Sequence, residues 1–323
     1  MFKPFIFFAI GILCCAVANA AVLDVESALR ATYNNCVGID GYLQDMKVKA
    51  GISTAVAGAG TAMGIGATVV GIVKSKTDVL IEEKYKLLEN LSYGASGDVE
   101  TLDSEEWLKI FQESSENNAE FVVNSTLDNA SNEQIEQIRA LDEKSKKLGN
   151  WRTGLMAGNT ATNIAGVVLS GKNKVDISLS EQIQNCKVSL QNLRRAIAQA
   201  RIDGIDVAEA INIESVCQGL EYVDADNIAR INNLAKGGMV SSAVGTGTGV
   251  VGVITSVLAN SDKVRKDDSN QGRQKEKNLN VAANVLAVGG TLASATATIF
   301  NATQIKVIKD FVDVTEKCSE ALR

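Results

Sequence analysis

The stretch GISTAVAGAGTAMGIGATVVGIV, residues 51–73, contains no charged residue and is rich in glycine, alanine and threonine. A helix needs about 20 mostly apolar residues to cross a bilayer, and this stretch is long enough. The same composition also suits a closely packed helix of a soluble bundle, and glycine-rich runs form phosphate-binding loops in other proteins. The fold depends on which of these three interpretations applies.

Three more stretches lack charged residues: 153–171, 237–261 and 278–305. Sliding-window hydropathy is borderline for three of the four stretches and poor for 153–171, which carries Asn159 and Asn163. Length therefore favours helices that span a membrane, and hydrophobicity supports this only in part.

Small residues recur four positions apart in these stretches, which places them in a line on one helix face. Such a line lets another backbone approach closely, as in membrane helix association. In water each glycine would cost a helix up to about 1 kcal/mol relative to alanine. The predicted helix-packing positions are Gly60, Gly64, Gly154, Gly158, Gly166, Gly245 and Gly249.

The chain resembles itself at two places. The segment from Ser53 matches the segment from Ser241, and the segment around Leu148 matches the one around Leu279. This pattern predicts a duplicated helical hairpin, with a long acidic insert in the first copy. We expect a first repeat at 21–203 with a helical insert at 74–152, and a second repeat at 204–323.

The first 20 residues have the layout of a secretory signal peptide. Lys3 precedes an apolar run, and the small triplet Ala18-Asn19-Ala20 follows it. The run is too short for an ordinary membrane span. We therefore expect cleavage after Ala20 and a mature protein in the cell envelope, in the membrane rather than soluble in the periplasm or secreted.

Composition argues against most catalytic chemistry. The chain has no histidine, the commonest general base and metal ligand, so histidine-based hydrolysis and most zinc sites are disfavoured. The net charge of −6 provides no electrostatic footprint for nucleic acid. The only proline is Pro4, so long helices are favoured. We expect a protein that is not an enzyme and has no catalytic residues, metal or cofactor.

One motif formally matches a dinucleotide-binding fingerprint, with Gly247, Gly249 and Gly252 in the spacing GxGxxG. The motif should follow a strand and open a helix, but here it lies in the middle of an uncharged small-residue stretch. Helix packing is the better interpretation, and we expect no nucleotide.

Cysteines flank both copies of the repeat. The mature chain has four of them, which allow three pairings. Repeat symmetry favours a bond between Cys36 and Cys186 and another between Cys217 and Cys318, and four free buried cysteines are the alternative. If all four uncharged stretches cross a membrane, these cysteines lie on the oxidising side, where disulfides persist.

Basic residues then border the cytoplasmic ends of the four stretches, in accord with the positive-inside rule. The residues concerned are Lys74, Lys76, Lys144, Lys146, Lys147, Arg152, Lys263, Arg265, Lys266, Arg273, Lys275 and Lys277. The bias is moderate, because lysines also lie on the outer flanks.

One segment outside the uncharged stretches is clearly amphipathic. Ile183, Cys186, Leu190, Leu193 and Ile197 recur at spacings of three and four, which predicts a helix with one buried face. Gly204 is expected to end this helix.

The expected fold is all-α, with two repeated helical hairpins that pack through Gly/Ala/Ser/Thr seams. Signal peptide and small-residue hairpins together resemble glycine-zipper proteins of the bacterial envelope in general layout, and this likeness assigns no role to any residue. We expect a structural or scaffold membrane protein that associates with itself or with other membrane helices in a lipid bilayer. Two alternatives stay open: an oligomeric pore, and a soluble secreted or periplasmic bundle that binds a partner or an apolar ligand.

Overall fold

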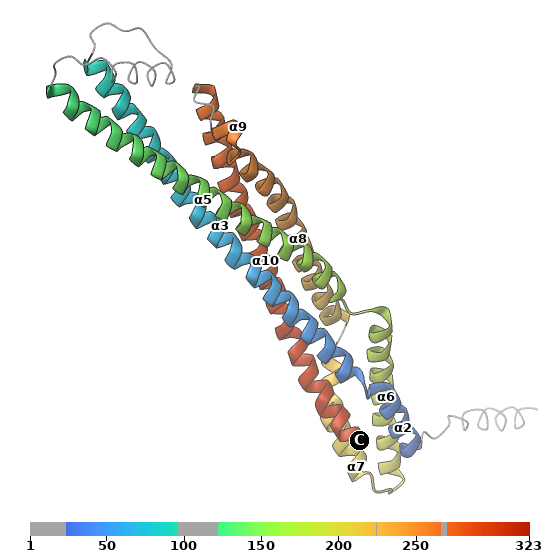
Figure 1. Ribbon diagram of the computed structural model, residues 1–323. Helices are drawn as coiled ribbons and strands as arrows, with labels where there is room; N and C mark the ends of the chain where they lie inside the picture. The colour runs from blue at the N-terminus through green and yellow to red at the C-terminus, as the bar shows by residue number, and fades with distance from the viewer. Residues whose placement is uncertain (1–23, 96–121, 224, 266–269) are drawn as a thin grey trace, which may run out of the picture. The chain divides into compact units, whose positions relative to one another are not determined.

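The computed structural model describes residues 24–95, 122–223, 225–265 and 270–323. Helices are the only regular secondary structure in these ranges, which confirms the predicted all-α class for the described residues (Figure 1). The predicted signal peptide at 1–20 and the middle of the predicted insert, residues 96–121, lie outside the described residues.

Four long helices dominate the described chain: α3 (Ile39–Ala95), α5 (Val122–Lys172), α8 (Ala225–Ala259) and α10 (Asn270–Leu322). Without proline inside them, these helices run for 35 to 57 residues. The shorter elements are α2 (Val25–Cys36), α6 (Ile177–Ile202), α7 (Ala208–Cys217), the 3₁₀-helix η1 (Gln218–Tyr222) and α9 (Asp262–Arg265).

Local signals explain where α6 begins and ends. The Asp176 carboxylate accepts hydrogen bonds from the backbone N–H of Leu179 (2.8 Å) and the hydroxyl of Ser178 (3.0 Å), and these bonds lower the pKa of Asp176. Gly204 follows the helix with φ 73°, a conformation that glycine adopts without strain. The predicted end of this helix is confirmed.

The chain forms two compact units. Unit 1 comprises the described residues up to Gly51 together with Lys172–Lys236 and Ala302–Arg323, and unit 2 comprises Ile52–Gly171 and Gly237–Asn301. Each unit takes residues from both predicted repeats, since α3, α8 and α10 contribute to both units. The repeats are segments of sequence, whereas the units are defined in space, so the two divisions do not coincide.

Unit 1 has an ordinary hydrophobic core. The predicted apolar face of α6 is buried, and Leu193 is fully inaccessible. Large aliphatic side chains from the other elements pack with this face, among them Ile39, Leu43, Leu220, Ile231 and Ile308. Burial of this apolar surface stabilises the folded state by about 25 cal/mol for each Å² removed from water.

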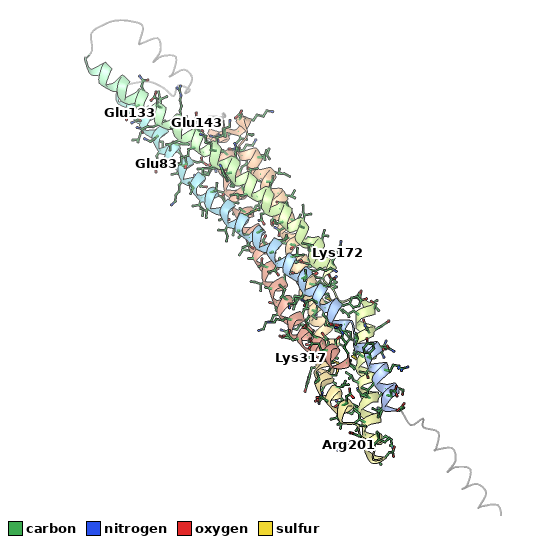
Figure 2. The ribbon with its side chains drawn as sticks, turned by 60° about the horizontal axis from the view of Figure 1, so that its bottom comes forward. Glu83, Glu133, Glu143, Lys172, Arg201 and Lys317 are labelled. Carbon is green, nitrogen blue, oxygen red and sulfur yellow. A yellow bond between two sulfur atoms is a disulfide. The ribbon has the colours of Figure 1, made fainter. Side chains whose placement is uncertain are left out.

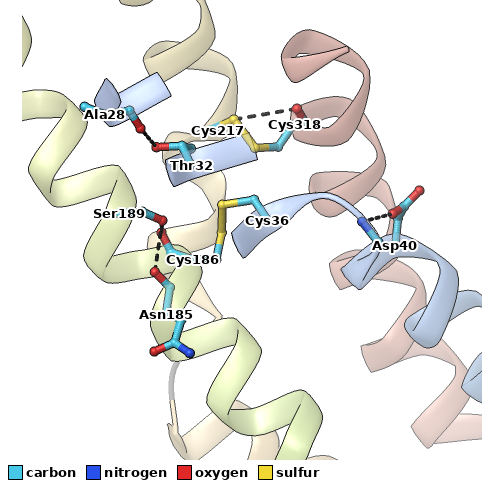
Figure 3. The surroundings of a disulfide bond; sticks show 10 residues. Ala28, Thr32, Cys36, Asp40, Asn185, Cys186, Ser189, Cys217 and Cys318 are labelled. Atoms are coloured by element: carbon cyan, nitrogen blue, oxygen red, sulfur yellow. Dashed lines mark hydrogen bonds between the residues drawn. A yellow bond between two sulfur atoms is a disulfide. The ribbon is translucent and has the colours of Figure 1, made fainter. Parts of the chain in front are cut away.

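Two disulfides lie within the core of unit 1 (Figure 3). The Cys36–Cys186 bond joins the end of α2 to α6, and the Cys217–Cys318 bond joins the end of α7 to α10. Their S–S distances are 2.03 and 1.98 Å. These are the pairs that repeat symmetry favours, and each bond connects parts of the chain that are more than 100 residues apart.

Unit 2 is built from parts of α3, α5, α8 and α10. On each helix the buried residues follow one another at intervals that alternate between three and four residues. The buried stripes are Ser53, Ala57, Gly60, Gly64, Ala67, Gly71 and Lys74 on α3; Ser145, Gly149, Arg152, Met156, Asn159, Asn163, Gly166 and Ser170 on α5; Gly238, Ser242, Gly245, Gly249, Gly252, Ser256 and Ala259 on α8; and Asn280, Ala283, Ala287, Gly290, Ser294, Ala297 and Asn301 on α10. A period of seven residues is that of a coiled coil, here with small residues in the seam.

Candidate functional site

Six of the seven predicted helix-packing glycines lie against a neighbouring helix. A Cβ added at Gly60 would lie 2.5 Å from the Thr162 hydroxyl, and one at Gly64 would lie 2.4 Å from the Thr291 hydroxyl. The corresponding nearest side chains are Met63 for Gly158, Ser242 for Gly166, Asn163 for Gly245 and Thr160 for Gly249. Glycine is therefore needed there because a side chain of another helix, mostly a polar one, fills the space.

Gly154 differs from the other six. A Cβ at this position would meet no described atom within 4 Å, and Gly154 lies on the exposed face of α5. The spacing of four residues identified a line of small residues, but it did not show which side of the helix that line faces.

An amide cluster lies in the middle of unit 2. The Asn163 side-chain amide donates to the side-chain and backbone oxygens of Asn159, at 2.9 and 3.0 Å. The Ser294 hydroxyl lies 2.8 Å from Asn159 Oδ1 and 3.1 Å from Asn163 Oδ1. All three residues are at least 97% buried. Hydrogen bonds compensate these buried polar groups for the loss of water.

A buried charge network lies farther along the same interior. Lys74 has no exposed surface, and its Nζ lies 2.7 Å from Asp78 Oδ2 and 3.6 Å from Glu276 Oε1. Asp78 also accepts hydrogen bonds from Ser145 of α5 and from Asn280 of α10. One carboxylate thus connects three helices.

Arg152 is the second fully buried cation of this network. Its guanidinium donates to Ser256 Oγ at 3.0 Å, to Asn280 Oδ1 at 2.9 Å and to Asn284 Oδ1 at 3.2 Å. These partners are neutral, and no carboxylate lies within 4.0 Å of the guanidinium in the described part of the chain. A buried charge needs such a shell of hydrogen bonds to be tolerated.

This network corrects part of the sequence interpretation. Lys74 and Arg152 were counted among the basic residues that border the membrane on its inner side, but both are buried between helices. The Arg265 side chain is also only 6% exposed and pairs with Asp142. Exposed charges do lie near the α3–α5 connection, among them Glu83, Glu133 and Glu143 (Figure 2). Fewer exposed basic residues therefore support the predicted cytoplasmic side than the sequence suggested.

The exposed face of unit 2 is strongly apolar along its uncharged stretches. Large aliphatic side chains point outward on all four helices. Among them are Ile65, Val69, Ile72, Ile164, Val168, Val244, Val250, Val251, Ile254, Val257, Leu258, Val281, Val285, Val288, Leu292 and Ile299. The buried hydrophobic residues of unit 2 are mostly alanine, and the larger ones among the described residues are Ile138, Met156 and Val264. Polarity in this unit is thus inverted relative to a water-soluble protein.

Three helical segments are long and apolar enough to cross a membrane: Val25–Leu88, Ala225–Ala259 and Gln271–Leu322. Four stretches were expected to be candidates, and α5, which contains 153–171, does not reach the same hydropathy among the described residues. Arg152, Asn159 and Asn163 lower the mean hydropathy of α5, and all three side chains point into unit 2.

No family model, no curated protein and no solved structure matches the chain.

Sequence reasoning missed the charge network, although a signal for it was present. Lys74 continues the three-and-four spacing of the small residues on α3, and Arg152 does so on α5. A heptad count carried past the end of each uncharged stretch places both cations in line with the small residues, but it does not show that this line is buried.

Proposed function

We propose that the protein is a non-enzymatic membrane protein of the cell envelope, in which unit 2 forms a membrane-spanning bundle with a scaffold or helix-association role. The observation that carries this proposal is the inverted polarity of unit 2. Along the uncharged stretches of unit 2 the large exposed side chains are valine, isoleucine and leucine, whereas the buried residues are mainly glycine, alanine, serine and asparagine, with Lys74 and Arg152 buried at one end.

Water would be a poor solvent for such a bundle. The interior buries little apolar surface beyond alanine, so the hydrophobic effect would contribute little to its packing. The exterior would meanwhile expose a contiguous apolar surface, which soluble monomers rarely do. In lipid both problems disappear, because close backbone packing and interhelical hydrogen bonds drive association there.

Within this proposal α5 crosses the membrane along with the other three long helices. Its low hydropathy comes from side chains that would not meet lipid, whereas Ile164 and Val168 are about half exposed on its outer face. Polar residues in membrane helices usually face the bundle interior in this way.

Hydrogen bonds between α5 and α10 support the predicted duplication of the hairpin. The Ser294 hydroxyl lies 3.1 Å from Asn163 Oδ1, and the Ser170 hydroxyl donates to Asn301 Oδ1 at 3.2 Å. Both pairs are 131 residues apart, which is the offset that aligns Leu148 with Leu279. This offset is the one that a duplicated hairpin predicts for equivalent residues on two facing helices.

The decisive experiment places a lysine on the outer face of unit 2. Ile254→Lys and Val285→Lys replace side chains that are 55% and 65% exposed. If the face contacts lipid, each lysine costs about 2.5–3.5 kcal/mol of insertion free energy near the bilayer centre. The matched control is Val188→Lys in unit 1, where the valine is 54% exposed. Membrane integration is measured as protein that stays with the membrane after an alkaline carbonate wash.

We expect the double variant Ile254→Lys/Val285→Lys to be released by carbonate and the unit 1 control to stay with the membrane. Release of the unchanged protein by carbonate would instead favour the soluble bundle. Retention of the double variant at the level of the unchanged protein would also contradict a lipid-facing surface. It would mean that positions 254 and 285 face water, where a lysine side chain has almost no free-energy cost.

A further inference from the structure

A surface groove of about 550 Å³ lies on unit 2 between α3 and α10. Its lining comes from both helices and combines apolar with polar residues: Ile72, Ser75, Lys76, Val79, Leu80 and Asn284. The groove begins where the uncharged stretch 51–73 ends, so in the proposed topology it lies at the level of the lipid headgroups.

Two neutral polar side chains meet at the floor of the groove, although most of its accessible lining is apolar. The Asn284 amide donates to Ser75 Oγ at 3.0 Å, so these two side chains meet between the helices. On its other side Asn284 accepts a hydrogen bond from Arg152, the buried cation that has no carboxylate within 4.0 Å among the described residues. Asp78 balances this charge through Asn280, so the exposed lysines around the groove are the groups that would attract a negative ligand.

Further cations surround the groove. Lys76 is exposed and lines it directly. Lys277 is exposed on α10 one heptad before Asn284, and therefore on the same face of that helix, and its charge also acts on Glu82 of α3. Glu82 is itself paired with Lys86 at 2.9 Å. Neither Lys76 nor Lys277 forms an ion pair within 4.0 Å in the described ranges, so both are available to an anion.

The walls of the groove are apolar. Ile72, Val79 and Leu80 are each about half exposed, and Val69 and Ile65 continue the apolar surface from Ile72 along α3 into the uncharged stretch. A ligand that matches this groove carries a negative group beside a hydrocarbon chain. Basic pockets between membrane helices bind anionic lipid headgroups in this way.

We propose that this groove binds one anionic phospholipid of the bilayer, with its phosphate at Lys76, Lys277 and Ser75 and an acyl chain along Ile72 and Val69. This inference rests on the proposed membrane location of unit 2. The proposed scaffold would thus also bind a specific class of lipid through named side chains.

The test measures lipid retained by the full-length protein. The protein is purified in detergent, supplied with phosphatidylglycerol or with phosphatidylcholine of the same acyl chains, and examined by native mass spectrometry. We expect one phosphatidylglycerol to be retained at a concentration about tenfold lower than phosphatidylcholine. Lys76→Glu/Lys277→Glu should abolish this preference. Lys147→Glu/Lys263→Glu makes the same charge change with exposed lysines of the same unit outside the groove and should keep the preference.

A second variant tests the groove without changing charge. Val79→Trp fills the apolar wall and should lower phosphatidylglycerol retention as the charge reversal does. Equal retention by the unchanged protein and both groove variants overturns the proposal, and so does an equal loss in the control pair. Competition by free glycerol phosphate also overturns it, because the site would then bind phosphate rather than a lipid.

Carbonate washing of the same variants separates this inference from the proposed function. Release of the unchanged protein from membranes would contradict the membrane location itself. Retention in the membrane without any preference for anionic lipid would contradict only the lipid site.

Discussion

Unit 1 and unit 2 share three helices, and yet they sort side chains in opposite ways. Unit 1 buries leucine, isoleucine and valine around two disulfides, whereas unit 2 buries glycine, serine, asparagine and two cations and exposes valine and isoleucine. Helices of the two units thus bury opposite kinds of side chain. Unit 1 is held by removal of apolar surface from water, and unit 2 is held by close packing and hydrogen bonds.

The charge network should produce the largest difference between the units. Asp78→Ala leaves the fully buried Lys74 without its closest anion, and removal of one partner of a buried pair typically costs about 3–5 kcal/mol. The matched control is Asp45→Ala in unit 1, whose pair with Lys49 has the same i,i+4 spacing but is about half exposed and is worth about 0–1 kcal/mol. Thermal unfolding in detergent, followed by hydrogen exchange of each unit, measures both changes. A loss in unit 2 no larger than that of the control would show that the network does not hold these helices.

The disulfides should act on unit 1 alone. Cys36→Ser/Cys186→Ser opens a link between residues 150 positions apart and should lower the free energy of unfolding of unit 1 by about 2–5 kcal/mol. The measurement is the same thermal unfolding experiment, and exchange in unit 2 should stay unchanged.

The location of these cysteines can be tested in intact cells. All four mature cysteines are at most 3% exposed, so a membrane-impermeant thiol reagent should label them only after a reductant has opened both bonds and loosened the core of unit 1. Labelling without reduction would contradict the bonds, and labelling only after cell lysis would contradict export.

The glycine seam should show a smaller but position-specific effect. Gly245→Leu adds a side chain where even a Cβ would lie 2.7 Å from the Asn163 amide, and overpacking of this kind typically costs about 1–3 kcal/mol. Gly154→Leu makes the same change on the same unit where the space is open. Comparison of the two melting temperatures measures the seam itself. Equal destabilisation would mean that leucine disturbs these helices regardless of the face.

The smallest expected effect belongs to the N-cap of α6. The pKa of Asp176 is lowered in the folded state by its bonds to Leu179 and Ser178, so the stabilisation is present above its unfolded-state pKa. It is lost as the pH falls through the folded-state pKa. Asp176→Ala should therefore slightly lower the melting temperature of unit 1 at neutral pH, and the difference should vanish in acid. A difference that persists in acid would mean that the carboxylate charge is not its cause.

Several features of the fold could be predicted from local pattern. The spacing of Ile183, Leu190 and Leu193 identified the buried face of α6, and Gly204 identified its end, because each depends only on neighbours in the chain. The charge network could not be found by the same means. Lys74 and Arg152 lie at the edges of uncharged stretches, where a cation ordinarily faces water, and both have partners on other helices, Glu276 for Lys74 and Ser256 for Arg152.

The hydropathy of α5 is low for a related reason. It averages over the whole circumference of a helix, so Asn159 and Asn163 count against membrane spanning although both side chains are buried in the bundle. The groove was also invisible in the sequence, because Lys76 and Asn284 come from helices more than 200 residues apart.

The sequence by itself determined the helical class, the amphipathic face of α6, the small-residue stretches and the likeness between the two halves. These follow from composition and periodicity, which act within one helix. Only the tertiary structure decided which glycines meet a neighbour, which cations are buried and that unit 2 is polar inside and apolar outside. Those properties depend on which helix faces fit together, and fit is a relation between distant segments that no single segment contains.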